Sequence, residues 1–326
     1  MVGQENAGAR RFACTACGVC CNRGPEMELG ETAALAGRFI CRLLFKVHSL
    51  PLHERGRRAD LWGQGQKSGL PLAAALDESR AHVRRFAAHE EIDKAHGRSL
   101  HLSISALTVD ADEGRCPALE DRGCGIYASR PLACRSVPFH YSRPVSTLAG
   151  YLDEFTGVPA RACDTSEAAP VVLSGDSVLD VSMREARAGA LAMGDSDRAW
   201  KAEIARLMLS SAAADAGLPS YRTVVENSDR GVASLVPMLP AWRIAVRVGL
   251  LSSAAFNRIC RDQIALLKRD LERATAPMAP PLQSMLLDYE LELAKAGGPV
   301  LADALNAALR SARPSSGPSP LWSRGN

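Results

Sequence analysis

Four cysteines crowd into the ten-residue run FACTACGVCC, from Phe12 to Cys21. The first three, Cys14, Cys17 and Cys20, are separated from one another by two residues. At this spacing one short loop can hold three corners of an iron–sulfur cubane, as in bacterial ferredoxins. A C-x2-C pair is also the usual half of a zinc site. Either centre needs a further thiolate from elsewhere in the chain.

A second group of cysteines lies much later in the sequence. Its members are Cys116, Cys124, Cys134 and Cys163. Pro117 follows Cys116, as a proline follows the remote cluster ligand in bacterial ferredoxins, and this favours a 4Fe–4S cluster as the cofactor, with zinc as the alternative. Cys21 directly follows Cys20, and consecutive side chains diverge, so the two can face different centres. The eight thiols suffice for two zinc sites or two cubanes, and a single cluster with spare thiols is the other possibility.

The opening residues MVGQENAGARRF contain no apolar segment of the kind found in secretory signals, so we expect a cytoplasmic protein. Disulfides are rare in that reducing compartment, which favours metal or redox chemistry over a vicinal or surface disulfide. Cys41 and Cys260 each lie among apolar, helix-forming residues, where a lone cysteine acts as a small hydrophobe. We leave both out of the site.

Charged and polar residues near the second group have two interpretations. Arg130 and Arg135 flank Cys134, and their guanidinium groups could offset the negative charge of a thiolate-ligated centre, or they are ordinary surface arginines. His140 could complete a mixed site, but beside two aromatic residues we interpret it as a partly buried hydrogen-bonding residue. No nucleophile elbow or dinucleotide fingerprint occurs, so the sequence identifies no catalytic residue and leaves enzymatic activity undecided.

The elements that must position these cysteines follow from hydrophobic spacing. Helical periodicity predicts one helix over residues 27–50 and another over 72–96, with a loop over 51–71 between them. Alternating apolar and β-branched residues predict a strand over 100–109, which leads to the second cysteine group. From about residue 166 onward Ala, Leu and Arg dominate, which indicates helices.

These patterns predict a mainly α fold. We expect an irregular cysteine-cluster metal-binding domain with one or few short strands over residues 1–165, a helical domain over 166–312 and a disordered tail over 313–326. The net charge of +3 and few aromatic residues argue against nucleic acid as a partner. Arg243 and Arg247 interrupt the apolar stretch 238–256, which therefore indicates a core helix or a contact surface for a protein partner rather than a membrane span.

The order C-x2-C-x2-C-C, then C-P-x-L and C-x-I-Y-x-x-R-P-x-x-C-R, resembles the CxxCxxCC family of zinc- or iron-chelating cysteine-cluster proteins, also called YkgJ-like. The family cysteines fall on Cys14, Cys17, Cys20, Cys21, Cys116, Cys124 and Cys134, with Cys163 as the eighth. The family core is matched by Ile126, Tyr127, Arg130, Pro131 and Arg135. The resemblance covers about the first half of the chain.

This resemblance implies metal binding, with a role in metal or cluster handling or in redox chemistry. A distant relative with a similar cysteine cluster methylates flagellin lysines. One alternative is therefore a metalloenzyme that modifies a protein or small molecule. Another is a structural zinc module that mediates protein binding.

Overall fold

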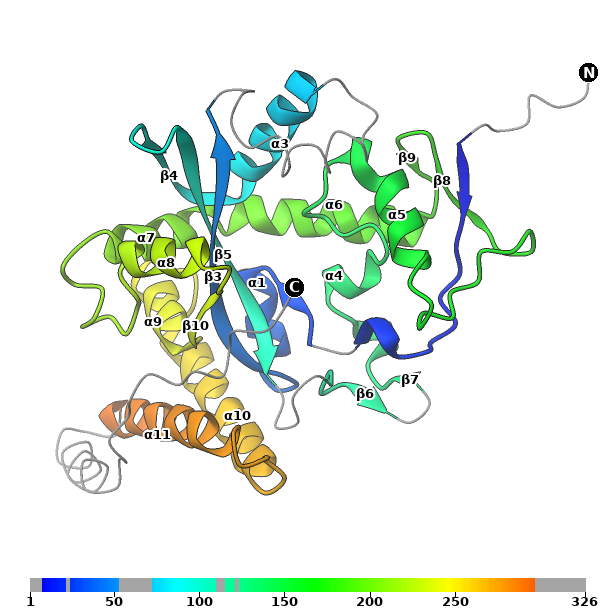
Figure 1. Ribbon diagram of the computed structural model, residues 1–326. Helices are drawn as coiled ribbons and strands as arrows, with labels where there is room; N and C mark the ends of the chain where they lie inside the picture. Colours follow the sequence, from blue (N-terminus) through cyan, green and yellow to red (C-terminus); the bar gives the residue numbers. More distant parts are fainter. Residues whose placement is uncertain (1–7, 22–23, 53–71, 110–114, 121–122, 297–326) are drawn as a thin grey trace, which may run out of the picture. The chain divides into compact units, whose positions relative to one another are not determined.

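The computed structural model describes residues 8–21, 24–52, 72–109, 115–120 and 123–296 (Figure 1). They form two compact units, each built from separate stretches of the chain. Unit 1 combines Met1–Met27, His48–Ser103 and Ala118–Ser196, and unit 2 combines Glu28–Val47, Ile104–Pro117 and Asp197–Asn326. The predicted tail over 313–326 and most of the predicted loop over 51–71 lie outside the described residues.

Unit 1 contains short strands and helices around the cysteines. In chain order they are β1 (Ala9–Arg11), the 3-10 turn η1 (Val19–Cys21), β2 (Glu26–Met27), α3 (Leu72–Phe86), β4 (Ala87–Asp93), β6 (Leu119–Glu120), β7 (Gly123–Cys124), η2 (Tyr127–Ser129), α4 (Leu132–Arg135), η3 (Val145–Thr147), α5 (Leu148–Thr156), β8 (Val171–Ser174), β9 (Ser177–Val178) and α6 (Val181–Ser196). Strands β3 (Ile40–Pro51) and β5 (Arg98–Val109) belong in part to each unit.

Unit 2 is mostly helical. Its other elements are α1 (Leu29–Leu35), α7 (Arg198–Met208), α8 (Tyr221–Asp229), β10 (Ser234–Pro237), α9 (Leu239–Arg247), α10 (Ser253–Leu271) and α11 (Ala279–Ala296). Trp242 and Tyr289 are fully buried in its core with ring centroids 6.1 Å apart. Gln263 on α10 donates from Nε2 to the carbonyl oxygens of Ala36 and Phe39, each at 2.7 Å, which satisfies two acceptors behind α1.

The prediction of a mainly α fold is wrong. The structure is 47% helical and 20% strand, with three sheets among the described residues, so the fold is mixed α/β. One sheet has the order β1-β8-β9, a second has the order β10-β3-β5-β2 with β4 paired to β5, and β6 pairs with β7.

Two of the predicted helices end early and continue as strands. The helix expected over 27–50 is α1 followed by β3, whose residues 40–45 are almost all buried. A short continuous apolar run fits a buried strand as well as a buried helix, so periodicity alone could not separate them. The helix expected over 72–96 ends at Phe86, after which β4 pairs antiparallel with β5. The strand expected over 100–109 is confirmed within β5.

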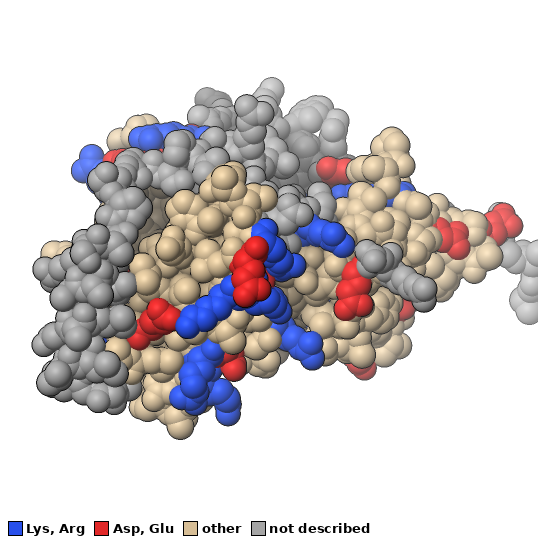
Figure 2. All heavy atoms as spheres, turned by 90° about the horizontal axis from the view of Figure 1, so that it is seen from below, with Lys and Arg blue, Asp and Glu red and all other residues tan. Residues whose placement is uncertain are grey.

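The apolar stretch 238–256 contributes mainly to the core of unit 2, since Trp242, Ile244 and Phe256 are buried, while Val248 and Leu250 are exposed. Among the described residues no helix combines the length and apolar character needed to cross a membrane. On the face drawn in Figure 2, Lys and Arg side chains lie interspersed with Asp and Glu side chains, in line with the small net charge.

Candidate metal centre

The N-terminal strand of unit 1 runs antiparallel to the segment that ends its cysteine-rich part. Strand β1 pairs with β8, and beyond the strand Phe12 N donates to Pro170 O at 3.1 Å. Ala13 and Asp164 then exchange both backbone hydrogen bonds, with N to O distances of 2.8 and 3.1 Å. Segments from opposite ends of unit 1 therefore lie side by side.

This backbone bridge brings together cysteines from the two groups. Cys14 follows Ala13 and Cys163 precedes Asp164, and in an antiparallel pair those two neighbours lie across from each other. The pairing continues for one more step, because Thr15 Oγ1 donates to the carbonyl oxygen of the residue before Cys163 at 2.6 Å. The first cysteine of the early group therefore lies next to the last cysteine of the late group.

The loop after Cys14 has the backbone of a tight turn. Ala16 has φ 56° and Gly18 has φ 77°, both in the left-handed region, which glycine adopts freely and alanine adopts at some energetic cost. Ala16 N donates to Cys14 Sγ at 3.4 Å, and Cys21 N donates to Gly18 O at 2.9 Å. The turn thus directs backbone N–H groups toward sulfur, an arrangement that stabilises thiolates.

Two thiols of this loop, Cys17 and Cys20, have lowered pKa values. A backbone N–H of Val19 that donates to sulfur lowers the pKa of Cys17. Hydrogen bonding from Cys21 lowers the pKa of Cys20 to about 6, and the nearby positive charges of Arg161 and Arg130 contribute. Cys20 is therefore mostly thiolate at neutral pH, the form in which cysteine binds metal.

The pKa of Cys163 is raised, and the causes of this shift indicate which groups lie near its sulfur atom. Burial raises the pKa of the Cys163 thiol first, and the negative charges of Cys17, Cys20 and Cys14 raise it further. These four sulfur atoms are thus close enough to repel one another when ionised. A bound cation would remove that repulsion.

A small apolar core packs against two of the cysteines. It is formed by Phe12, Phe139, Leu148, Leu152, Phe155, Val172 and Leu173, and both Cys20 and Cys163 pack against it. The rings of Phe12 and Phe155 meet edge to face with centroids 6.2 Å apart. One core therefore holds the two cysteine-bearing segments.

The β6–β7 hairpin lies against the same loop and carries Cys124. Leu119 is paired with Cys124, and the Leu119 side chain packs on Gly18, where an added Cβ would lie 3.6 Å from it. Gly123 lies against Ala16 and has φ 119°, which favours glycine there. The structure therefore brings the hairpin of Cys124 to the early group.

The remaining predicted site residues are all half-buried. Cys21 is half-buried at the end of η1, Cys134 is half-buried on α4, and Cys116 is half-buried in unit 2. All ten cysteines lie within the described residues, and none of them forms a disulfide. Cys41 and Cys260 are buried in unit 2, and burial raises the pKa of each to about 12.

Two arginines supply positive charge to the sulfur atoms, and only one was predicted. Arg130 stacks on Tyr127 with its guanidinium carbon 3.7 Å from the ring centroid, and it lowers the pKa of Cys20. Arg161 stacks on Phe155 at 4.1 Å and acts on both Cys20 and Cys163. Its position two residues before Cys163 was the only sequence signal that could have pointed to it.

His140 is a hydrogen-bonding residue, as predicted. Its Nδ1 lies 2.7 Å from Ser142 Oγ, and its ring stacks on Tyr141 with centroids 4.3 Å apart. These contacts explain its position without a metal.

The donor chemistry fits zinc or iron, although the sulfur atoms do not form a closed site. Within the described ranges no three His, Cys, Asp or Glu side chains are grouped in a way that could hold a metal ion. Soft thiolates with lowered pKa values are the donors that zinc and iron–sulfur clusters use, and neighbouring guanidinium groups can offset their negative charge.

Comparison with known proteins identifies part of the chain. Residues 73–164 match the family model CxxCxxCC, described as "Putative zinc- or iron-chelating domain". The matched range includes Cys116, Cys124, Cys134 and Cys163 and begins after the early quartet. No curated protein and no solved structure matched the chain.

Proposed function

Because residues 73–164 belong to the CxxCxxCC family of zinc- or iron-chelating domains, we propose that this chain is a cytoplasmic metal-binding protein whose centre also takes thiolates from its N-terminal loop. The observation that carries the proposal is the backbone bridge between Ala13 and Asp164. It aligns Cys14 with Cys163 and so joins the early cysteine group to the family domain.

The principal ligands of the proposed centre are thiolates of unit 1. Cys14, Cys17, Cys20 and Cys163 form the principal set, because their charges act on one another. Cys124 lies on the hairpin that contacts the same loop. We assign Cys21, Cys116 and Cys134 as further ligands of the same or a second centre, on the strength of the family motif alone.

The role that best fits these ligands is the handling of zinc, iron or an iron–sulfur cluster. When bound, zinc would supply structural cross-linking, whereas a cluster would supply electron transfer. Cys14 and Cys17 are exposed, so an incoming metal or cluster can reach them from solvent. Arg130 and Arg161 would offset the negative charge of the assembled thiolates.

The proposal is tested by matched alanine variants of three cysteines, purified anaerobically. Cys17→Ala and Cys163→Ala should lose most of the bound metal, since each removes a principal ligand. Cys260→Ala is the control, because Cys260 is buried in unit 2 and is not among the proposed ligands. Zinc, iron and acid-labile sulfide are measured per chain together with visible absorbance.

The outcomes separate the metals as well as testing the site. Iron with equivalent sulfide and broad visible absorbance would identify a cluster, and stoichiometric zinc without colour would identify a zinc centre. The assignment is wrong if Cys17→Ala and Cys163→Ala retain as much metal as Cys260→Ala.

A further inference from the structure

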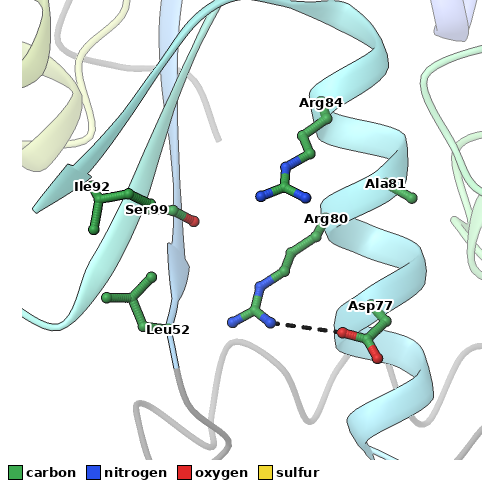
Figure 3. A pocket seen from close by; sticks show the side chains of 7 residues that line it. All are labelled: Leu52, Asp77, Arg80, Ala81, Arg84, Ile92 and Ser99. Atoms are coloured by element: carbon green, nitrogen blue, oxygen red, sulfur yellow. Dashed lines mark ion pairs between the residues drawn. The ribbon is translucent and has the colours of Figure 1, made fainter.

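A pocket of about 370 Å³ opens in unit 1 between helix α3 and the neighbouring strands (Figure 3). It is lined by Leu52, Asp77, Arg80, Ala81, Arg84, Ile92 and Ser99. None of the cysteines lines it, so the pocket is distinct from the proposed metal centre. It is large enough to hold a small organic molecule.

Two arginines of α3 give the pocket its charge. Arg80 and Arg84 are four residues apart, which places them on the same helix face, and Figure 3 shows both side chains directed from the helix toward the strands. Like charges at this spacing repel each other and destabilise a helix. The arrangement therefore favours an anion between the helix and the strands.

The existing partners of these guanidinium groups use only part of their N–H donors: among the described residues Arg80 donates from Nη2 to Pro51 O, and Arg84 donates from Nε and Nη2 to Glu90. Among the described residues that line the pocket Asp77 is the only acidic one, and its Oδ1 is 3.6 Å from Arg80 Nη1, too long for a hydrogen bond. The Asp77 side chain is also 77% exposed, so solvent weakens this ion pair. Arg84 pairs with Glu90 at 2.9 Å through Nη2, and a ligand oxyanion would bind the Nη1 donors of Arg84 beside this pair.

A buried hydroxyl group offers a further donor. Ser99 is 4% exposed, and its Oγ lies 3.0 Å from Nε2 of the fully buried His101. His101 Nδ1 is buried with no hydrogen-bond partner in the described part of the chain, and burial lowers the pKa of this ring. When the neutral ring donates from Nε2 to Ser99, the serine hydroxyl finds one acceptor among the described residues, Leu50 O, at a long 3.4 Å. An oxygen atom in the pocket would be a better acceptor.

The opposite wall is apolar. Leu52 follows the end of β3 and Ile92 comes from β4, where its side chain remains 46% exposed. An exposed isoleucine beside two guanidinium groups suits a ligand that has both a charged and an apolar part.

We infer that this pocket binds a small organic anion. Its carboxylate or phosphate group lies between the guanidinium groups of Arg80 and Arg84 and accepts from the Ser99 hydroxyl, while a short apolar part contacts Leu52 and Ile92. Guanidinium groups bind both kinds of oxyanion through paired hydrogen bonds, so the shared feature of the ligand is its oxyanion.

Isothermal titration calorimetry of the full chain tests the inference with three probes of similar size: butyl phosphate, pentanoate and uncharged butanol. We expect one or both anions to bind, and butanol to give no binding heat. The stronger of the two anions identifies the headgroup. Added NaCl should weaken the binding, because the guanidinium groups are partly exposed and salt screens them.

Variants of α3 locate the binding to this pocket. Arg80→Gln and Arg84→Gln should each weaken anion binding by about 10-fold or more, equivalent to about 1.4 kcal/mol. Arg85→Gln is the matched control, because Arg85 is the next residue on the helix, pairs with Asp195 at 2.9 Å and does not line the pocket. Ala81→Phe should also abolish binding, since its side chain fills the pocket while both arginines remain. This variant tests the pocket independently if an arginine variant fails to fold.

The inference is overturned if neither anion binds the native chain, or if Arg85→Gln weakens binding as much as Arg84→Gln. Metal content is measured on the same samples. It should be unchanged in the α3 variants, so that this result and that of the cysteine variants are independent.

Discussion

Phe12 is the residue through which the fold of unit 1 and its metal affinity should be most tightly coupled. It lies between β1 and the Ala13 bridge, is 2% exposed and belongs to the core on which Cys20 and Cys163 pack. We predict that Phe12→Ala detaches the N-terminal segment locally and weakens metal binding, although it removes no ligand.

The size of the effect follows from the packing. Truncating a buried Phe to Ala costs about 3–5 kcal/mol, of which the edge-to-face contact with Phe155 accounts for about 0.5–1.5 kcal/mol. Whole domains are stable by only about 5–15 kcal/mol, and a terminal strand opens for less than that. If β1 must be re-formed before metal can bind, affinity falls by about 10²- to 10³-fold.

The assay is competition for zinc against a chromophoric chelator, combined with thermal unfolding followed by circular dichroism. Phe45→Ala is the matched control, because Phe45 is also fully buried but lies in unit 2. It should lose comparable stability and change zinc affinity by less than about threefold. Equal zinc affinities for the Phe12 and Phe45 variants would refute the idea that this segment holds the cysteines in place.

Two further predictions concern buried ionisable side chains. Burial lowers the pKa of His82 to about 4, below its ordinary 6.5, so the folded state resists protonation of this ring. The free energy of unfolding therefore keeps its full value above about pH 6.5 and falls by up to about 3 kcal/mol as the pH drops toward 4. Urea unfolding at several pH values should show a shallower acid dependence in His82→Leu, and an unchanged slope would contradict this. Lys201 and Glu28 form an ion pair with side chains only 5% and 3% exposed, so Lys201→Met leaves a buried carboxylate unpaired and should cost about 3–5 kcal/mol of unfolding free energy. Arg222→Met, which breaks the exposed pair with Glu226, should cost less than about 1 kcal/mol, and similar losses in both variants would contradict the role of burial.

The cysteine chemistry was predictable because ligand spacing is written directly in the sequence. The C-x2-C-x2-C-C run and the later C-P and R-P-x-x-C-R motifs pointed to a chelating family, and the family match over residues 73–164 agrees. The choice of zinc, iron or a cluster was not predictable, because thiolates serve all three. The eight-cysteine ligand set stays a prediction.

The fold was less predictable because the strands here lack a strand-like pattern. Residues 40–45 of β3 are almost continuously apolar and β4 is rich in charged residues, so neither alternates clearly. Pairing between β1 and β8 joins segments far apart in the chain, which local periodicity cannot detect. The role of Arg161 could not be predicted for the same reason, since its effect on the pKa of Cys20 depends on the folded core.

The pairing of the N-terminal segment also bears on how cysteines so far apart in the chain would serve the proposed centre. Thr15 and Ala162 are 147 positions apart, and closing a flexible loop of that length costs about 4 kcal/mol in chain entropy. In unit 1 that loss is already offset by the backbone bonds of β1 and by burial of Phe12. Metal binding then has only to draw sulfur atoms together over short distances in a turn that already lowers the pKa of Cys17 and Cys20. The family domain and the early quartet should therefore load metal as one cooperative unit, with the N-terminal strand supplying the cooperativity.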